Sequence, residues 1–302
     1  MCSYFKNFIR RNIPSFIVVP GKKLKKECRR KKLEQQKKKY PVIYRETLAN
    51  DFLSLGIKAG DNVIVHSSLS KIGYVEGGSK TVIDALLEVI GEEGTLLFPT
   101  SPANTYQYYY MKSNPVFDVL HSPSQMGAIS EYFRKQEGVV RSFHPLEPVC
   151  AKGPLANYFT KDHFSQSTPY NKNSPYYKLI ETKGKILSIG VLDFENTCIN
   201  LHAFDDAIPD LKIPVYAKEE FVSRMIDEKG NEHFMKTKVH DVRYSFIRKP
   251  NLLKPLLEKE KVIVYGKIGR ADSMLIDAFL LQETLIKYYY EKGITMYTPF
   301  GD

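Results

Sequence analysis

Short apolar runs alternate with amphipathic segments along most of the chain. Residues 62–65 form a β-branched run, and residues 95–98 form a second apolar run that ends at Pro99. Between them, residues 79–90 place apolar side chains at helical spacing, beginning with a serine that can cap a helix. A strand, a loop, a helix and a second strand in this order are typical of a crossover unit in an α/β sheet.

The same alternation of strand-type and helix-type segments continues, less regularly, to the C-terminus. Two β-type runs flank the turn-forming segment 227–231 and predict a hairpin. The further predicted elements are helices over residues 126–136, 174–182, 199–207 and 273–291, a strand over 185–191, and hairpin strands over 220–226 and 233–239. No internal repeat or linker is visible after residue 45. The pattern therefore predicts one α/β domain over residues 46–302 that carries an inserted hairpin.

The overall composition excludes several classes of protein. The chain has 302 residues and 43% hydrophobic content, which suffices for a buried core and rules out wholesale disorder. No run approaches the ~18 consecutive apolar residues of a membrane-spanning helix. The four cysteines form no CxxC pair, which argues against a zinc ribbon or a disulfide scaffold and favours a reducing, cytoplasmic setting.

The positive net charge belongs to an N-terminal arm, residues 1–45. Residues 1–40 contain 14 Lys and Arg against two acidic residues, a net charge of +12. The remaining 262 residues contain 30 basic and 32 acidic residues, a net charge of −2. Any preference for a polyanionic partner is therefore a property of the arm alone.

Three interpretations of this arm stay open. It can be a disordered, solubilising extension. Apolar residues between positions 5 and 17 recur at spacings of three and four before the basic run 22–39, which suits peripheral attachment to anionic lipid at the inner face of a membrane, although Pro14 interrupts the pattern. A basic tract also contacts nucleic-acid phosphates, but the apolar stripe favours lipid over nucleic acid.

A serine- and glycine-rich loop over residues 66–78 is the first candidate for chemistry. Backbone amides exposed by glycines, together with the N-terminus of the following helix, form a natural phosphate site. Lys71 and the hydroxyls of Ser67 and Ser68 can assist. The loop matches neither GxxxxGK[ST] nor GxGxxG, so a tight connection between strand and helix explains it equally well.

Histidines and their neighbours supply the other candidates. Arg141 and His144 lie in the segment RSFHP, where the arginine can meet a phosphate, and His163 is a titratable group in a polar loop. On a helix, His202 and Asp205 would share a face, so that the carboxylate can orient the imidazole. For each of them an ordinary structural or surface role is the more common case. No metal-binding spacing such as HExxH occurs, so no metal is predicted.

Taken in order, these segments resemble the aminoglycoside 3-N-acetyltransferase family, the acetyl-CoA-dependent antibiotic N-acetyltransferases. The matching segments are VIVHSSLSKIGYVEGGSKTVIDALLEVIGEEGTLLFPT, PSQMGAISEYFRKQEGVVRSFHP, AKGPLANYFTKDH, SPYYKLIETKGKILSIGV and LHAFDD. They follow the family's order over roughly residues 46–210. The resemblance implies an α/β fold with a central mixed sheet and helices on both faces.

The resemblance also implies transfer of an acetyl group from acetyl-CoA to an amine of an amino sugar. It suggests a histidine–carboxylate pair near the thioester, here His163 as the base, Asp205 as its partner and His202 beside it. The expected cofactor-binding residues are Ser67, Ser68, Lys71, Ile72, Gly73, Gly77, Ser124, Arg141 and Ser142. The expected substrate-binding residues are Tyr108, Glu195 and Asp206. Cys150 and Cys198 lie in no nucleophile motif of the family, so direct transfer is expected.

Two departures from the family leave the acceptor open. The familiar His-x-x-Glu motif ends here in Asp205, which is one methylene shorter. The basic arm precedes the segment in which the resemblance begins. The acceptor can therefore be an aminoglycoside antibiotic or an amino sugar of surface-polysaccharide biosynthesis. A non-catalytic CoA- or sugar-binding protein of the same fold is the alternative.

Overall fold

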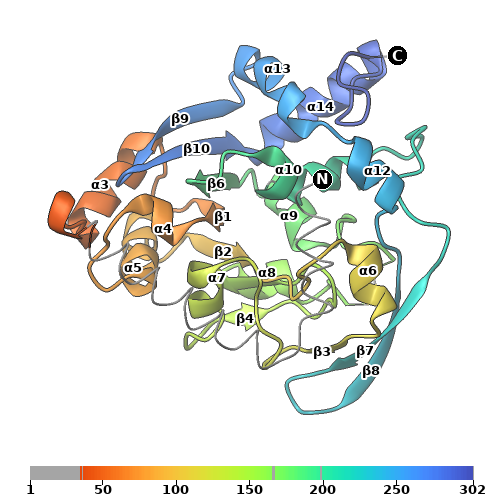
Figure 1. Cartoon of the computed structure of the whole chain (residues 1–302), viewed down its shortest axis with the longest axis horizontal. Helices are drawn as coiled ribbons and strands as arrows, with labels where there is room; N and C mark the ends of the chain where they lie inside the picture. The colour runs from red at the N-terminus through yellow and green to blue at the C-terminus, as the bar shows by residue number, and fades with distance from the viewer. Residues whose placement is uncertain (1–34, 36, 165–166, 198, 302) are drawn as a thin grey trace.

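A seven-stranded sheet forms the centre of the structure (Figure 1), a computed structural model that describes residues 35, 37–164, 167–197 and 199–301. Its strand order is β4-β5-β2-β1-β6-β10-β9. The strands are β1 (Asn62–Ser67), β2 (Thr95–Pro99), β4 (Val140–Arg141), β5 (Val149–Lys152), β6 (Lys185–Ile189), β9 (Ile263–Ile268) and β10 (Ala271–Asp277). β1 pairs in parallel with β2 and β6, whereas the outer pairs are antiparallel. The predicted mixed sheet is confirmed.

Helices cover both faces of this sheet because the side chains of its strands alternate between the faces. In β1, Val63 and Val65 contribute to one hydrophobic core and Ile64 to the other. The first core includes residues of α3 (Arg45–Leu55), α5 (Ser79–Ile90) and α7 (Ala128–Phe133), and the second includes residues of α8 (Ala156–Thr160), α9 (Pro175–Glu181) and α14 (Ala278–Lys292). The expectation of helices on both faces is therefore also confirmed.

The predicted hairpin belongs to a second, three-stranded sheet, which lies at the lower right of Figure 1. Strands β7 (Phe221–Ile226) and β8 (Glu232–Thr237) pair antiparallel, and β3 (Val116–Asp118) pairs in parallel with β7. Every second residue of β7 is buried from its first residue onward, as the two-residue period of a half-buried strand requires. The hairpin is confirmed, whereas β3 carries no sequence signal strong enough to predict it.

The C-terminal helix is shorter than its pattern predicts. Residues 273–277 belong to β10, and α14 begins at Ala278. The Asp277 side chain caps this helix by accepting a hydrogen bond from the backbone N–H of Leu280 at 2.9 Å. A short apolar run fits a strand or a buried helix equally well, so periodicity alone does not place this boundary.

The remaining helices are short and lie in the connections between strands. They are α4 (Leu69–Ile72), α6 (Gln107–Lys112), α10 (Phe194–Thr197), α11 (His202–Ala207), α12 (Val242–Ile247) and α13 (Lys254–Lys259), with 3-10 turns over Ile199–Leu201 and Pro250–Leu253. The predicted helix over 126–136 is shortened to α7, and that over 199–207 is divided between a 3-10 turn and α11. The predicted helix over 174–182 and strand over 185–191 are present as α9 and β6.

The basic arm lies outside the described residues up to position 34, and so does its apolar stripe. The interpretations of the arm therefore stay predictions. Within the part of the chain that the structure describes, no helix combines the length and apolar content needed to cross a membrane.

Candidate active site

A buried polar pair lies on α11. His202 begins this helix and Asp205 follows it by three residues, with 3.0 Å between Nδ1 of the imidazole and Oδ2 of the carboxylate. The Tyr297 hydroxyl donates to the same carboxylate oxygen at 3.1 Å. Both members of the pair are more than nine-tenths buried. The shared face expected from their spacing is confirmed.

Arg248 determines which nitrogen of His202 carries the proton. One guanidinium nitrogen lies 2.8 Å from Nε2 of His202, and another donates to the backbone carbonyl of Glu195 at 3.1 Å. A guanidinium has no acceptor, so Nε2 must accept and the ring proton lies on Nδ1, which donates to Asp205. The imidazole thus carries a lone pair on Nε2 and is oriented by a carboxylate, as a general base requires.

A second histidine comes from the chain that follows the hairpin. The ring of His240 lies 4.1 Å from that of His202. It stacks on Tyr170 at 5.3 Å and on Tyr216 at 5.0 Å. Its buried Nε2 has no hydrogen-bond partner among the described residues. Sequence reasoning missed His240 because no spacing motif links it to His202; its position directly after a predicted hairpin strand is the only signal.

A buried glutamate lies next to these rings. The Gln107 side-chain amide donates to Oε1 of Glu147 and to the Tyr170 hydroxyl, in both cases at 2.9 Å. Burial raises the pKa of Glu147 to about 7, although these hydrogen-bonding groups act against it. A carboxyl group that changes charge near neutral pH therefore lies beside the histidine cluster, and the sequence alone does not reveal it.

Burial dominates the electrostatics of the cluster. It lowers the pKa of His202 and of His240 well below the usual value, and the positive charge of Arg248 adds to the effect. It raises the pKa of Asp205 to about 8, whereas the Tyr297 hydrogen bond and the charge of Arg248 lower it. Both imidazoles are therefore neutral at physiological pH, which is the form that can accept a proton.

The cluster adjoins a cleft of about 730 Å³. This volume is typical of a small-molecule site. Asp205 and Tyr216 line the cleft on the side of the cluster, and apolar side chains within residues 208–217 form much of its wall. The Asp205 side chain itself is fully buried, so the cleft lies next to the cluster without exposing this carboxylate.

His163 does not join this cluster. Its Nδ1 lies 2.9 Å from the Ser142 hydroxyl oxygen and its Nε2 lies 2.9 Å from the backbone carbonyl of Pro169. Because a carbonyl only accepts, Nε2 carries the proton and Nδ1 accepts from Ser142. Burial lowers the pKa of His163 to about 3. The expected pairing of His163 with Asp205 is wrong, because scaffold groups occupy both nitrogens and Asp205 pairs with His202.

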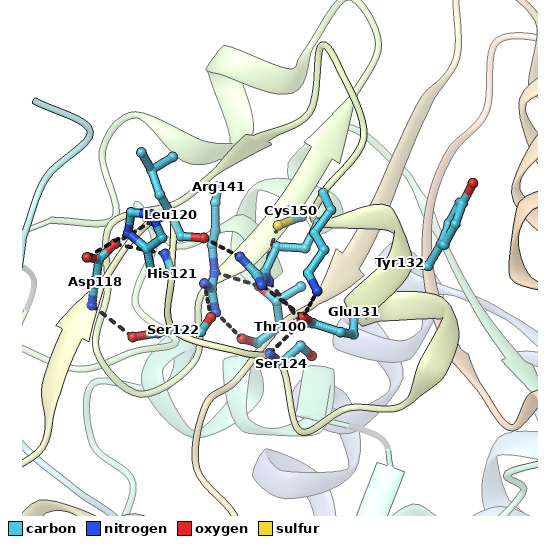
Figure 2. A network of polar contacts seen from close by, with 12 residues as sticks. Thr100, Asp118, Leu120, His121, Ser122, Ser124, Glu131, Tyr132, Arg141 and Cys150 are labelled. Atoms are coloured by element: carbon cyan, nitrogen blue, oxygen red, sulfur yellow. Dashed lines mark hydrogen bonds and ion pairs between the residues drawn. The ribbon is translucent and has the colours of Figure 1, made fainter.

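Arg141 is bound to the scaffold and does not face a ligand. Figure 2 shows its guanidinium among Thr100, Ser122 and Leu120, and its nitrogens donate to the backbone carbonyls of Thr100, Val119 and Ser122. Burial lowers its pKa to about 10. The expectation that Arg141 and Ser142 bind CoA is corrected, because both side chains are buried and engaged in hydrogen bonds within the protein.

Sequence comparison identifies the family to which this fold and this cluster belong. The sequence model described as aminoglycoside 3-N-acetyltransferase matches residues 64–289, well over half of the chain. The chain belongs to this family. The family predicted from the ordered motifs is therefore confirmed.

Individual relatives agree with this assignment. Aminoglycoside N(3)-acetyltransferase VII of Streptomyces paromomycinus is 34% identical over 161 residues, 49% of this chain and 56% of the relative, so the match spans little more than half of that protein. Among solved structures, AAC-VIa bound to sisomicin is 25% identical, has a TM-score of 0.68 and covers 83% of this chain and 98% of its own. A binary complex of AAC-IIIb with CoASH, 24% identical with a TM-score of 0.69 and coverages of 83% and 97%, has the same fold.

The serine- and glycine-rich loop of this family member lies beside the segment that leads into α7. Ser67 ends β1, and its buried hydroxyl has no partner among the described residues. A Cβ added to Gly127, the residue before α7, would lie 3.5 Å from the backbone oxygen of Ser67. A Cβ at Gly78, before the first turn of α5, would meet only open space. Space is therefore open in front of Gly78, although its backbone N–H donates to the carbonyl of Val75 at 3.1 Å.

Other parts of the same loop belong to the core. Ile72 is fully buried among the hydrophobic side chains below α5. A Cβ at Gly73 would lie only 2.9 Å from Cδ1 of Ile43. Ser124 is buried, and its hydroxyl accepts a backbone N–H two residues later at 3.1 Å. The expected cofactor contact of the Ile72 side chain is therefore wrong, whereas that of Gly73 stays a prediction; Lys71 is exposed.

The expected substrate residues do not share one site. Asp206 accepts hydrogen bonds from Thr168 and, at 2.6 Å, from Tyr216, which lines the cleft. Tyr108 instead packs edge-on against Phe221 of the hairpin, with 5.6 Å between ring centroids. Glu195 contributes its backbone carbonyl to Arg248, and its side chain is exposed.

The remaining candidates concern cysteine and metal chemistry. Burial raises the pKa of Cys150 to about 11, so it is a poor nucleophile; Cys198 lies outside the described residues. The ligand atoms of His202, Asp205 and His240 lie within 4.8 Å of one another. Asp205 and Arg248 already occupy both nitrogens of His202. This donor set therefore does not fit a resident metal ion without displacement of an arginine.

Proposed function

We propose that this protein transfers the acetyl group of acetyl-CoA to an amine of an aminoglycoside or of another amino sugar. The observation that carries the proposal is the lone pair on Nε2 of His202, which a buried carboxylate orients beside a cleft of suitable volume. The family to which the chain belongs supports both the reaction and acetyl-CoA as the co-substrate.

The reaction requires a base because a protonated amine cannot attack a thioester. His202 accepts a proton from the acceptor nitrogen as the new C–N bond forms, and Asp205 stabilises the resulting imidazolium through Nδ1. The C–S bond then breaks, and the imidazolium returns the proton to the CoA thiolate. In the free protein Arg248 donates to Nε2; the N–H of the acceptor takes over this position when the substrate binds.

CoA binding is assigned to the outer part of the loop. The unpartnered hydroxyl of Ser67, the exposed Lys71 and the open backbone at Gly78 support contact with its pyrophosphate, since α5 contributes the positive end of a helix dipole there. Ser68 and Gly77 lie in the same stretch and complete the proposed contact.

Release of the CoA thiol from acetyl-CoA, measured over a panel of amines, tests the proposal. We expect turnover with at least one amino sugar and a loss of about 10²- to 10⁴-fold in His202→Ala. His121→Ala is a matched control because the His121 side chain is 81% exposed and remote from the cluster in sequence. CoA binding without thiol release on any amine would favour a non-catalytic binding protein.

A further inference from the structure

The charged side chains of the cleft are not those expected around a polycation. Two lysines, Lys218 and Lys238, line the cleft together with two acidic residues, Asp205 and Glu220. Asp205 is engaged by His202, so it is not free to neutralise a ligand. A molecule with several ammonium groups would therefore meet two cations and one exposed carboxylate.

Neither lysine is held in a direct ion pair. Neither ammonium group makes a hydrogen bond or an ion pair with any residue that the structure describes. The nearby acids are engaged elsewhere: Glu219 pairs with Lys112 at 2.7 Å, and both carboxylate oxygens of Asp206 accept hydrogen bonds. Lys238 and Asp206 interact only through their charges.

Lys238 lies close in sequence to the histidine cluster. It lies two residues before His240, and its backbone N–H donates to the carbonyl of Ser167 at 2.8 Å, which holds this stretch of chain in place. Its side chain is half-buried. Arg248, the cation that donates to His202, likewise contacts a neutral ring and a backbone carbonyl.

We propose that the natural acceptor is an amino sugar that carries a phosphate ester, with the phosphate against Lys218 and Lys238 and the amine at His202. Lysine ammonium groups are common phosphate ligands, and the cleft volume accommodates more than one sugar ring. The proposal rests on the function proposed above, which it narrows from amino sugars in general to anionic ones.

Calorimetric binding to the full chain in the presence of CoA tests this preference without requiring turnover. The probes are glucosamine 1-phosphate, its uncharged analogue methyl glucosaminide, and sisomicin as a polycation. We expect the phosphate to bind at least about tenfold more tightly than methyl glucosaminide at low salt, and this advantage to shrink as salt screens the charges. Equal affinities, or tighter binding of sisomicin, would overturn the proposal.

Charge-reversal variants of the two lysines test where the phosphate binds. Lys238→Glu and Lys218→Glu are each expected to remove most of the tenfold preference, whereas Lys238→Arg keeps it. Lys229→Glu makes the same charge change in the exposed hairpin turn and should leave the preference intact. A preference that survives both reversals would contradict the assigned position.

UDP-linked glucosamine distinguishes a nucleotide-activated acceptor from a simple sugar phosphate. Tighter binding of the UDP-sugar than of glucosamine 1-phosphate identifies the diphosphate form, and weaker binding identifies the monoester. Thiol release is then measured on the same probes. Preferential binding of the phosphates without release on any amine would refute the proposed function alone, whereas release with no preference for phosphates would refute this narrower inference alone.

Discussion

Two buried histidine sites in this protein look alike in sequence and differ in structure. His163 and His202 are both more than nine-tenths buried, and burial lowers the pKa of each. The nitrogens of His163 contact a serine hydroxyl and a backbone carbonyl of the scaffold. Those of His202 contact a carboxylate and an arginine beside a cleft.

Burial and sequence motif do not distinguish a structural histidine from a reactive one. The hydrogen-bond partners of the ring nitrogens and the nearness of a cleft distinguish them. The Nε2 proton of His163 is donated to a carbonyl and its Nδ1 lone pair accepts from Ser142, so no ring atom is left for a substrate. Arginine at Nε2 of His202 leaves the lone pair in place and can be exchanged for the N–H of a substrate. The same reasoning removes Arg141 from the cofactor site, since its donors are saturated by backbone carbonyls.

The largest predicted contrast is between variants of these two histidines. His202→Ala should lower kcat by about 10²- to 10⁴-fold because it removes the base, and it should also lower the free energy of unfolding because its buried partners lose their hydrogen bonds. His163→Asn should leave kcat within about threefold but lower the free energy of unfolding by about 1–3 kcal/mol, because buried partners lose their hydrogen bonds. Single-turnover rates and denaturant melts measure the two effects. The opposite pattern would restore His163 as the base.

The second prediction concerns Asp205, the carboxylate that pairs with His202 and not with His163. Protonated Asp205 lacks the negative charge that stabilises the imidazolium of His202, so kcat/KM should rise with pH through about 8, the raised pKa of this carboxyl. Asp205→Asn should lower the plateau by about tenfold or more, as loss of a group that orients a histidine does, and should abolish this titration. Acceptors with different amine pKa values provide the control. If the midpoint of the pH profile shifts with the pKa of the acceptor amine for every acceptor, the role of Asp205 is contradicted.

A third prediction concerns Arg141, which we assign to the structural scaffold and not to the cofactor site. Arg141→Gln should lower the free energy of unfolding by about 2–4 kcal/mol, because several buried carbonyls lose a charged donor. The KM for acetyl-CoA should stay within about twofold. An unchanged melting curve together with a large rise in this KM would show that Arg141 binds the cofactor after all.

The smallest predicted effect concerns Glu147 beside the reactive cluster. Its pKa in the folded protein, about 7, lies above the ordinary 4.5, so the folded state binds a proton that the unfolded state releases between these values. Stability should therefore fall as the pH rises through this window. Glu147→Gln should raise the free energy of unfolding at pH 8 by about 1–3 kcal/mol and by much less at pH 5. Equal effects at the two pH values would exclude this titration.

The parts of the site that lie close together in sequence are predictable from it. His202 and Asp205 follow from helical spacing, and the loop after β1 follows from its serines and glycines between a strand and a helix. The hairpin follows from two β-type runs around a turn. In each case the responsible interactions are local, so a short window of sequence contains them.

The remaining site residues are brought together only by the tertiary fold. His240, Arg248 and Tyr297 reach α11 from positions 35 or more residues away along the chain, at the end of the hairpin, after α12 and after α14. The environment of His163 is likewise set by a serine 21 residues earlier. Residue type and spacing do not encode such contacts, so the sequence pairs His163 with the wrong acid.

The most direct test of the central claim is a crystal structure of the protein with CoA and an acceptor amino sugar. The reaction assigned to the cluster on α11 requires the acceptor nitrogen within hydrogen-bonding distance of Nε2 of His202, with Arg248 displaced from that atom. An acceptor nitrogen bound elsewhere, with Arg248 still donating to His202, would contradict it.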